Sequence, residues 1–387
     1  MSSAFQSIHK KIVIIGPAHP LRGGLASFNE RLATAFQSQG NEVSIYTFSL
    51  QYPDFIFPGT TQYSSEPAPA NLNIKVCINS INPYTWIKTG RQLKKEKPDL
   101  IVVRYWLPLM GPCLGTILRI AKKNSHTKVV CIVDNIIPHE KRFGDTLFTK
   151  YFVKPVDAFI TMSEKVLTDL RLFEKDKPAK TVLHPLYDNF GAIVSKAEAR
   201  MQLNIGINEK IILFFGFIRK YKGLDILLDA MKILQTDNPF LPKIKLLIAG
   251  EFYEDSKPYY DQIAILDIKD DLILRTHFIP DSEVKYYLCA ADVVVQPYRN
   301  ATQSGVTPLA YHFEKPMIVT NVGGLPALVP DNKVGLVAEP NAAAIALKIG
   351  EYFLKGEAFF LPNILEEKKK LSWTKLTDSI WEVANSK

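Results

Sequence analysis

Short apolar runs alternate with longer amphipathic stretches along the first half of the chain. Apolar runs of strand length lie at residues 11–16, 42–48, 99–104, 128–133 and 158–162. Stretches with helical spacing of apolar positions lie at residues 25–39, 84–97 and 107–123. Strands and helices that alternate in this way predict a parallel sheet covered by helices on both faces.

The second half of the chain repeats the pattern. Predicted strands lie at residues 210–216, 243–250, 273–278, 293–297 and 317–320. Predicted helices lie at residues 223–235, 259–266, 281–290 and 305–313, and the third opens with an acidic cap before Val284. The fold class is therefore α/β, with two doubly wound, Rossmann-like parallel sheets.

The length of 387 residues also favours two domains, because a single hydrophobic core rarely grows so large. The first β/α series gives way to the second near residues 187–205, so we expect domains at 1–190 and 191–365. A last amphipathic stretch occupies residues 372–385. We expect residues 366–387 to pack back onto the first domain.

Composition and cysteine usage indicate a globular protein in a reducing compartment. The chain is 47% hydrophobic, and its first ten residues have no apolar core, so no secretory signal is expected. Its four cysteines have neither metal nor disulfide spacing, which favours cytosolic thiols. Arginine, proline and glycine interrupt the apolar residues 101–121, which we interpret as a buried strand followed by a helix rather than a membrane span.

Positive charge is concentrated in the first half. The chain has a formal net charge of +8, and residues 1–190 alone hold 24 Lys and Arg against 15 Asp and Glu. Such a balance is typical of proteins that bind nucleic acid, anionic membranes or anionic substrates. The chain has no nucleic-acid motif, which favours an anionic membrane surface or a phosphorylated lipid. A merely solvated basic face is the alternative.

The predicted helix at 84–97 is the candidate membrane contact. Its cations are Arg91, Lys94, Lys95 and Lys97, and its other face carries Trp86, Ile87 and Leu93. Such a helix can rest on anionic lipid. An ordinary surface helix with Trp86 in the core is the alternative.

Two glycine-containing turns in the second half carry the candidate chemistry. In the first, Gly216 ends a strand and is followed by Arg219, Lys222 and Gly223. Ligands of open α/β sheets bind at the carboxyl ends of the strands, and helix N-termini there attract anions. Two cations beside two glycines in that place predict a diphosphate site. A solvated basic turn is the alternative.

The second turn follows the predicted strand at 293–297. Its residues Thr302, Gln303, Ser304, Gly305 and Val306 have the small-polar-then-glycine form that lets the backbone approach a phosphate. Ser304 is also suited to cap the following helix. The two roles are compatible.

In their order along the chain, these stretches resemble the nucleotide-sugar half of the GT-B-fold glycosyltransferases of family 4. The resemblance is carried by residues 214–230, 247–250, 278–280, 291–295, 298–306 and 315–324. Together with an amino-terminal glycine loop, it covers nearly the whole chain. It implies an enzyme whose two domains face each other across a cleft and whose donor is a nucleotide sugar. The donor-site residues that it implies are Gly23, Gly24, Gly216, Phe278, Ile279 and residues 302–306.

The diphosphate of the donor is bound in that family by an arginine and a lysine after the first strand of the donor domain. Lys222 matches the lysine. Phe217 occupies the arginine position, so Arg219, two residues on, would take that role.

Family members also commonly carry two glutamates, eight positions apart, that contact the transferred sugar and the ribose. Thr302 or Gln303 stands in place of the first, and Leu309 or Ala310 in place of the second. The departure concerns recognition of the donor sugar and of the ribose, whereas the phosphate-binding backbone is kept.

The first domain resembles the acceptor half of the family. Residues 16–24 look like its first glycine loop, which places Arg22 on the acceptor side together with Asp134 and Asn135. Many members have a histidine at the position of Asp134, where it contacts the donor sugar. His139 is the candidate for that role here. A loop histidine bonded to the backbone is the alternative.

A glycosyl transfer would use Arg219 and Lys222 to neutralise the departing diphosphate, and one positioned donor is typically worth roughly 3–4 kcal/mol. The chain has no Asp-x-Asp metal clamp, so we expect neither a metal ion nor a cofactor. The resemblance implies retention of anomeric configuration. Because residues 301–310 lack a carboxylate, we favour same-face attack, with the leaving phosphate accepting the acceptor proton, over double displacement.

These observations favour a retaining, metal-independent glycosyltransferase that moves a sugar from a UDP- or GDP-sugar to a lipid-linked or cell-surface glycan, as in polysaccharide biosynthesis. We expect it in the cytoplasm, peripheral on the inner face of the membrane, with no nucleic-acid partner. A nucleotide-sugar epimerase of the same fold is one alternative. A catalytically silent nucleotide-sugar-binding subunit is the other, and the missing glutamates support it.

Overall fold

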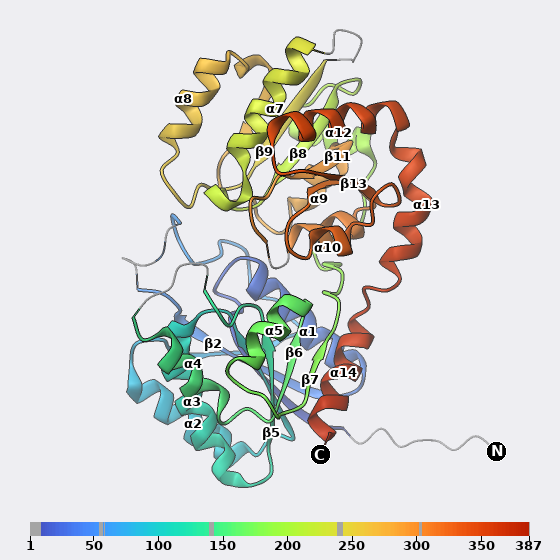
Figure 1. Cartoon of the computed structure of the whole chain (residues 1–387). Helices are drawn as coiled ribbons and strands as arrows, with labels where there is room; N and C mark the ends of the chain where they lie inside the picture. Colours follow the sequence, from blue (N-terminus) through green and yellow to red (C-terminus); the bar gives the residue numbers. More distant parts are fainter. Residues whose placement is uncertain are drawn as a thin grey trace, which may run out of the picture. The chain divides into compact units, whose positions relative to one another are not determined.

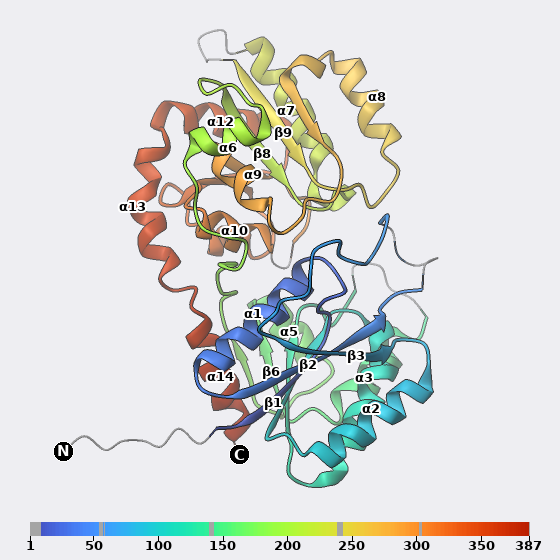
Figure 2. The ribbon, with the colours of Figure 1, turned by 180° about the vertical axis from the view of Figure 1, so that it is seen from behind.

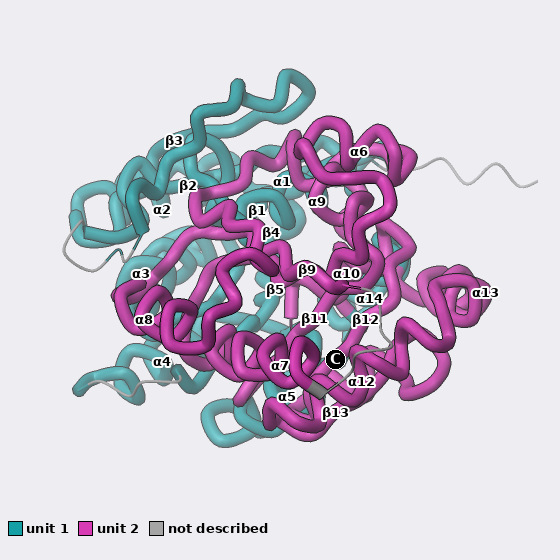
Figure 3. Tube along the Cα trace, turned by 90° about the horizontal axis from the view of Figure 1, so that it is seen from above, with its two compact units in different colours: residues 1–183, 372–387 teal, residues 184–371 magenta. Residues whose placement is uncertain are grey.

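The computed structural model describes residues 9–53, 57, 59–138, 143–237, 243–301 and 304–386. The chain divides into two compact units (Figure 3): Met1–Leu183 with Ser372–Lys387, and His184–Leu371. Each unit is built on one parallel β-sheet with helices on both of its faces (Figures 1 and 2). The predicted α/β class with two doubly wound sheets is confirmed.

The first unit has a seven-stranded sheet in the order β3-β2-β1-β4-β5-β6-β7. Its strands are β1 (Lys11–Ile15), β2 (Glu42–Leu50), β3 (Asn73–Asn79), β4 (Leu100–Tyr105), β5 (Lys128–Val133), β6 (Ala158–Thr161) and β7 (Ala179–Thr181). Its helices are α1 (Gly24–Ser38), α2 (Pro83–Glu96), α3 (Gly111–Ala121), α4 (Asp145–Val153), α5 (Glu164–Arg171) and α14 (Trp373–Asn385). In the middle of this sheet, Ile14 lies opposite Ile45 of β2 and Val102 of β4.

Central strands are buried nearly from end to end, which is why their sequences read as continuous apolar runs. Residues 101–121 belong to β4 and α3, as predicted, and α3 begins at Gly111 rather than at residue 107. Within the described residues, no helix is long and apolar enough to span a membrane. The pattern missed β3, an edge strand in which only Ile78 is buried.

Helix α14 belongs to the first unit, where it packs against α1 and strands β5 to β7. Trp373 lies against Phe28, with ring centroids 4.9 Å apart, and the guanidinium of Arg31 lies 5.0 Å from the Trp373 ring. Gln39 Nε2 donates a hydrogen bond to Thr377 Oγ1 (2.8 Å). The last helix of the chain thus completes the layer that α1 forms on this sheet.

The second unit has a six-stranded sheet in the order β10-β9-β8-β11-β12-β13. Its strands are β8 (Lys210–Phe215), β9 (Ile244–Ala249), β10 (Leu272–Arg275), β11 (Val293–Gln296), β12 (Met317–Thr320) and β13 (Gly335–Ala338). Its helices are α6 (Lys196–Leu203), α7 (Leu224–Asp237), α8 (Lys257–Leu266), α9 (Val284–Ala290), α10 (Val306–His312), α11 (Leu325–Leu328), α12 (Ala342–Lys355) and α13 (Glu357–Lys368).

Two predicted elements of this unit are corrected. The strand predicted to reach residue 278 ends at Arg275. The helix predicted from residue 281 begins at Val284 as α9, and the side chain of Glu283 at its N-cap position makes no capping hydrogen bond. Residues 281–283 form a turn instead, so the helix was predicted to begin three residues too early.

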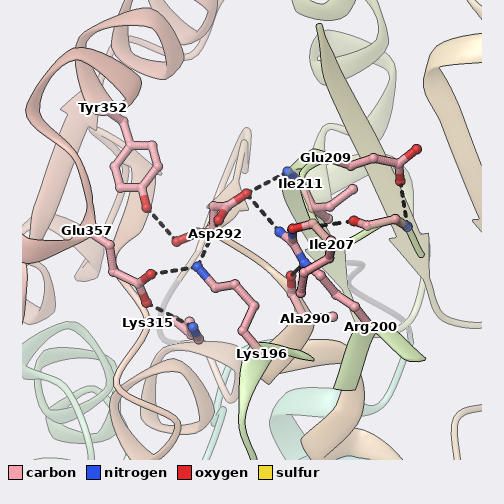
Figure 4. A network of polar contacts seen from close by, with 11 residues as sticks. Lys196, Arg200, Ile207, Glu209, Ile211, Ala290, Asp292, Lys315, Tyr352 and Glu357 are labelled. Carbon is pink, nitrogen blue, oxygen red and sulfur yellow. Dashed lines mark hydrogen bonds and ion pairs between the residues drawn. The ribbon is translucent and has the colours of Figure 1, made fainter. Parts of the chain in front are cut away.

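An ionic network at the amino ends of β8 and β11 holds several elements of this unit together (Figure 4). Asp292 accepts hydrogen bonds from Lys196 Nζ (2.8 Å), Arg200 Nη2 (3.2 Å) and the backbone N of Ile211 (2.7 Å). Glu357 accepts from Lys196 Nζ (2.7 Å). Burial alone would lower the pKa of Lys196, but its bonds to the two carboxylates outweigh burial and raise it. The network joins α6, β8, β11 and α13 on the edge of the sheet opposite the predicted ligand turns.

Candidate functional site

The order of strands reverses once in each sheet. In the second unit the chain runs outward from β8 to β9 and β10, and then returns to place β11 on the other side of β8. Open α/β sheets bind ligands beyond the carboxyl ends of the strands at such a reversal. The segments in that place are residues 216–223 after β8 and residues 297–305 after β11. These are the two turns that the sequence singled out.

The two turns are in contact. The backbone N of Arg299 donates to the carbonyl of Tyr221 (2.7 Å). Gly223 has φ 69°, and a Cβ at this position would lie 2.0 Å from the carbonyl oxygen of Pro297. Glycine is therefore required at position 223 for the backbones of the two turns to pack together.

Lys222 is a buried cation between these turns. Its side chain is 9% exposed, and its Nζ lies 3.0 Å from the position that a Cβ at Gly216 would take. The methyl Cγ2 of Val306 lies 3.7 Å from that same position. Within the described part of the chain, the aromatic ring of Tyr298, with its centroid 5.7 Å from Nζ, is a neighbour of the ammonium, and no carboxylate forms an ion pair with it.

Burial, and after it the positive charge of Arg219, lower the pKa of Lys222 to about 8. The protein therefore holds a charged ammonium at neutral pH in a place that disfavours its charge. Desolvating such a group without a counter-ion costs free energy. A bound anion would recover that cost, which makes Lys222 the strongest single indication of an anion site.

Arg219 stands at the start of the 3₁₀ turn η3 (Lys220–Lys222), with its guanidinium 5.1 Å from the ring centroid of Tyr253. Phe217 stacks on the same tyrosine, with ring centroids 4.0 Å apart and an angle of 27° between the planes. Ile218 N donates to the carbonyl of Glu251 (2.8 Å), and Tyr253 N donates to the carbonyl of Ile218 (3.0 Å). The segment after β8 is thus bonded to the segment after β9, and an aromatic pair supports Arg219.

Gly305 differs from the other glycines of the site. Its backbone has φ −68° and ψ −16°, which any residue can adopt. The described atoms nearest to a Cβ placed there are Cε2 and the hydroxyl of Tyr187, at 3.7 and 4.0 Å, which is ordinary contact. Ser304 Oγ accepts a hydrogen bond from Val306 N (3.2 Å) and bonds the hydroxyl of Tyr298 (3.2 Å). Neither backbone conformation nor packing within the described residues requires glycine at position 305.

The other residues predicted for the donor side do not all lie at these two turns. Thr302, Gln303 and His139 lie outside the described residues. Phe278 and Ile279 follow β10, which is separated from β8 by β9. Leu309 and Ala310, at the second glutamate position of the family, are buried on α10. The structure therefore brings together Gly216, Arg219, Lys222 and residues 304–306.

The acceptor-side residues and Gly23 and Gly24 belong to the first unit, whose strand order reverses between β1 and β4. Gly23 has φ 97° and immediately precedes α1, which begins at Gly24. The backbone N of Arg22 donates to the carbonyl of Gln62 (3.0 Å). Asn135 follows Asp134 directly after β5.

Asp134 forms a buried ion pair. Both of its oxygens accept hydrogen bonds from Arg104, from Nε and Nη2, at 2.5 Å each. The guanidinium of Arg104 also lies 3.8 Å from the ring centroid of Phe28, and a Cβ at Gly16 would lie 3.2 Å from Arg104 Cβ. The carboxylate of Asp134 is therefore neutralised by Arg104 and is poorly suited to act as a base or a nucleophile.

Sequence reasoning missed several residues of these sites. Tyr187, Tyr253 and Tyr298 carry no local signal, because their roles depend on chain segments that meet only in the fold. Arg104 did carry a local signal, because it is the only charged residue in the apolar run that forms β4 and a buried cation needs a partner. The structure supplies that partner in Asp134, directly after β5.

Two parallel sheets in sequence, each with a strand reversal, form the two-domain architecture of the GT-B glycosyltransferases. Comparison with known protein families supports the same class. The family described as glycosyltransferase family 4 matches residues 22–185, and the family described as glycosyl transferases group 1 matches residues 195–369. The chain belongs to the nucleotide-sugar-dependent glycosyltransferases of family 4.

Among its relatives is the D-inositol 3-phosphate glycosyltransferase of Corynebacterium glutamicum, 25% identical over 365 residues that cover 84% of this chain and 82% of that protein. Two solved structures share the fold. Sucrose-phosphate synthase from Thermosynechococcus elongatus has a TM-score of 0.72 at 18% identity and covers 97% of this chain and 98% of its own. Anabaena Alr3699/HepE, solved with UDP and glucose, has a TM-score of 0.71 at 15% identity over 96% of this chain and 98% of its own.

Proposed function

We propose that the protein transfers a sugar from a UDP- or GDP-sugar, with retention of configuration and without a metal ion, and that the second unit binds the donor. The observation that carries this proposal is Lys222, a buried ammonium between the two turns at the strand reversal. A diphosphate is an anion of the right charge for this cation and for Arg219 beside it. The complex of Anabaena HepE with UDP-glucose supports uridine as the base to test first.

The chemistry follows from which charges are available. As the anomeric bond breaks, negative charge grows on the leaving diphosphate, and Lys222 and Arg219 would stabilise it without a metal ion. Within the described residues, no cluster of three or more His, Cys, Asp or Glu could hold a metal. Residues 301–310 offer no carboxylate for a covalent intermediate. We therefore favour same-face attack in which the leaving phosphate accepts the proton of the acceptor hydroxyl.

The acceptor is a hydroxyl-bearing polar molecule, and we propose a lipid-linked or cell-surface glycan. The names of the relatives favour a second candidate, a phosphorylated cyclitol such as inositol phosphate. An acceptor screen with a radiolabelled UDP-sugar separates the two. Label transferred to an organic-soluble, lipid-linked product supports the first, and label transferred only to inositol phosphate contradicts it.

We also propose a cytoplasmic enzyme that rests on anionic lipid through α2. Leu93 of this helix is buried, and the Trp86 indole packs towards the core, where its Nε1 donates to the carbonyl of Asn79 (2.7 Å). Tyr84 is 71% exposed and Ile87 is 38% exposed. The exposed cations beside them are Lys88, Arg91, Lys94, Lys95 and Lys97. Exposed apolar side chains among cations suit an anionic interface.

Sedimentation with vesicles tests this location. Wild type is expected to bind vesicles that contain phosphatidylglycerol and not pure phosphatidylcholine. A variant with Lys94 and Lys95 changed to Glu is expected to lose binding, since each cation near the surface contributes about 1 kcal/mol. Equal binding of wild type and variant would contradict a membrane role for α2.

Calorimetric titration with UDP and GDP in the presence of EDTA tests the donor site. We expect wild type to bind one of the two nucleotides, and the double variant Arg219→Ala/Lys222→Ala to bind neither. Lys220→Ala is the matched control, because Lys220 lies in the same turn with its side chain exposed. Wild type that binds neither nucleotide would refute the proposal, and wild type that binds only after a divalent metal is added would refute its metal independence.

A further inference from the structure

Among the described residues, Tyr187 is the side chain that lies nearest to the Cβ position of Gly305. Its ring is 5% exposed and packs against His184 and Phe190, with centroids 4.8 and 5.4 Å away. The backbone of the same segment is held where Leu186 N donates to the carbonyl of Leu371 (3.1 Å). The tyrosine therefore presents one edge, with its hydroxyl, in a fixed direction.

The hydroxyl edge of Tyr187 faces the Cβ position of Gly305. A group that occupies the place of the missing side chain would lie 3.7 Å from Cε2 of Tyr187 and 4.0 Å from its hydroxyl oxygen. These distances are measured from the position of a carbon atom bonded to the backbone. A ligand atom that approaches Gly305 can move closer to the hydroxyl and reach hydrogen-bond distance.

The same place is electropositive. Val306, the next residue, lies with Lys222 Nζ on one side of Gly216, at 3.7 and 3.0 Å from the Cβ position of that glycine. Lys222 is more than nine-tenths buried and has no carboxylate partner among the residues that the structure describes. A glycine that the fold does not require thus lies near a cation that the fold does not neutralise. Both features are explained by an anion bound at residues 305 and 306.

We infer that Tyr187 is a donor-binding residue whose hydroxyl donates a hydrogen bond to a phosphate oxygen of the nucleotide sugar. This inference rests on the proposed function, because it needs a diphosphate beside Gly305. Tyr187 would then supply a neutral hydrogen-bond donor where Lys222 supplies charge.

The variant Tyr187→Phe tests this role, because it removes the hydroxyl and keeps the ring that packs against His184 and Phe190. Affinities for UDP, GDP and inorganic pyrophosphate are measured by calorimetry on the full chain, together with the thermal midpoint without nucleotide. A hydrogen bond to a charged group is worth enough to weaken diphosphate binding by about tenfold or more. We expect that loss with an unchanged midpoint. Tyr260→Phe, on exposed α8, is the matched control and is expected to bind as wild type.

Gly305→Ala is the second variant. We expect it to fold normally, since neither φ nor the described neighbours oppose a Cβ, and to bind diphosphate more weakly because the methyl group occupies the place of a phosphate oxygen. Adding Tyr187→Phe to Gly305→Ala should then cause little further loss, because both changes act on one contact.

The outcomes distinguish failure of the donor site from failure of the role of Tyr187. Wild type that binds no nucleotide refutes the donor site and the role of Tyr187 with it. Wild type that binds UDP or GDP while Tyr187→Phe binds equally well overturns only the inference about Tyr187. A loss confined to the nucleotides, with pyrophosphate affinity unchanged, also overturns it, because the hydroxyl would then act on the nucleoside.

Discussion

Replacing Lys222 with methionine should make the free protein more stable while it abolishes donor binding. Methionine has nearly the length and volume of lysine, so the change removes the charge and leaves little cavity. The pKa of Lys222 is lowered from 10.5 to about 8. Between those two values the unfolded chain binds more protons than the folded one, so the contribution of this residue to stability rises with pH across that window. Below pH 8 the folded protein carries the full penalty.

The size of the effect follows from the shift. A difference of 2.5 pKa units at about 1.4 kcal/mol each corresponds to a penalty of about 3 kcal/mol at pH 7, which falls to about 2 kcal/mol at pH 9. Lys222→Met should therefore raise the free energy of unfolding by up to these amounts at the two pH values. Most substitutions of buried residues do the opposite.

Denaturant unfolding of wild type and Lys222→Met at pH 7 and pH 9, with and without UDP or GDP, provides the measurement. Lys220→Met is the control and should change stability by less than about 0.5 kcal/mol, as exposed substitutions usually do. Two results would refute the reasoning. Destabilisation by Lys222→Met would mean that the ammonium supports the fold, and undiminished stabilisation by nucleotide would mean that it binds no phosphate.

Three further predictions concern the charged residues of the second unit. Nucleotide affinity measured by calorimetry should fall about tenfold between pH 7 and pH 9, because Lys222 loses its proton near pH 8, and the control Lys220→Met should show the same fall. Asp292→Ala should lower the free energy of unfolding by about 3–5 kcal/mol, measured with denaturant, because it leaves the buried cation of Arg200 without its carboxylate. Its nucleotide affinity should stay unchanged, because the ionic network lies at the amino ends of the strands, opposite the ligand turns. Arg219→Ala should weaken nucleotide binding, and adding Phe217→Arg should restore it in part, whereas no recovery would show that position 217 does not face the phosphates.

Burial explains how much of the fold the sequence could predict. Strands β4 and β5 are covered on both faces, so their apolar runs were visible without any partner. The edge strand β3 has one buried residue, and β7 has only three residues, all half-buried, so neither leaves a periodic signal. Helix α9 was predicted to begin three residues too early because the acidic residues before Val284 suggested a helix start, whereas residues 281–283 form a turn.

The residues of the candidate site were likewise predictable only in part from the sequence. Glycines and cations in a turn after a strand are local features, and Gly216, Lys222 and Gly305 could be recognised from them. The environment of these residues is not local. That Lys222 is buried, that Tyr187 borders Gly305 and that Arg104 neutralises Asp134 all depend on segments between 30 and more than 100 residues apart. Such contacts are set by the order of the strands, which the sequence pattern alone does not reveal.

The two strand reversals treat buried charge in opposite ways, and the contrast indicates which unit holds the donor. At the first, the cation Arg104 is matched by the carboxylate of Asp134 through two hydrogen bonds, so its charge is compensated without a ligand. At the second, Lys222 is also buried, and within the described residues no carboxylate forms an ion pair with it. A dianionic or trianionic diphosphate would compete poorly with Asp134 for Arg104, because the pair would have to be broken first. Beside Lys222 it would relieve a cost that the free protein already carries, and that difference in free energy favours the donor diphosphate at the second unit.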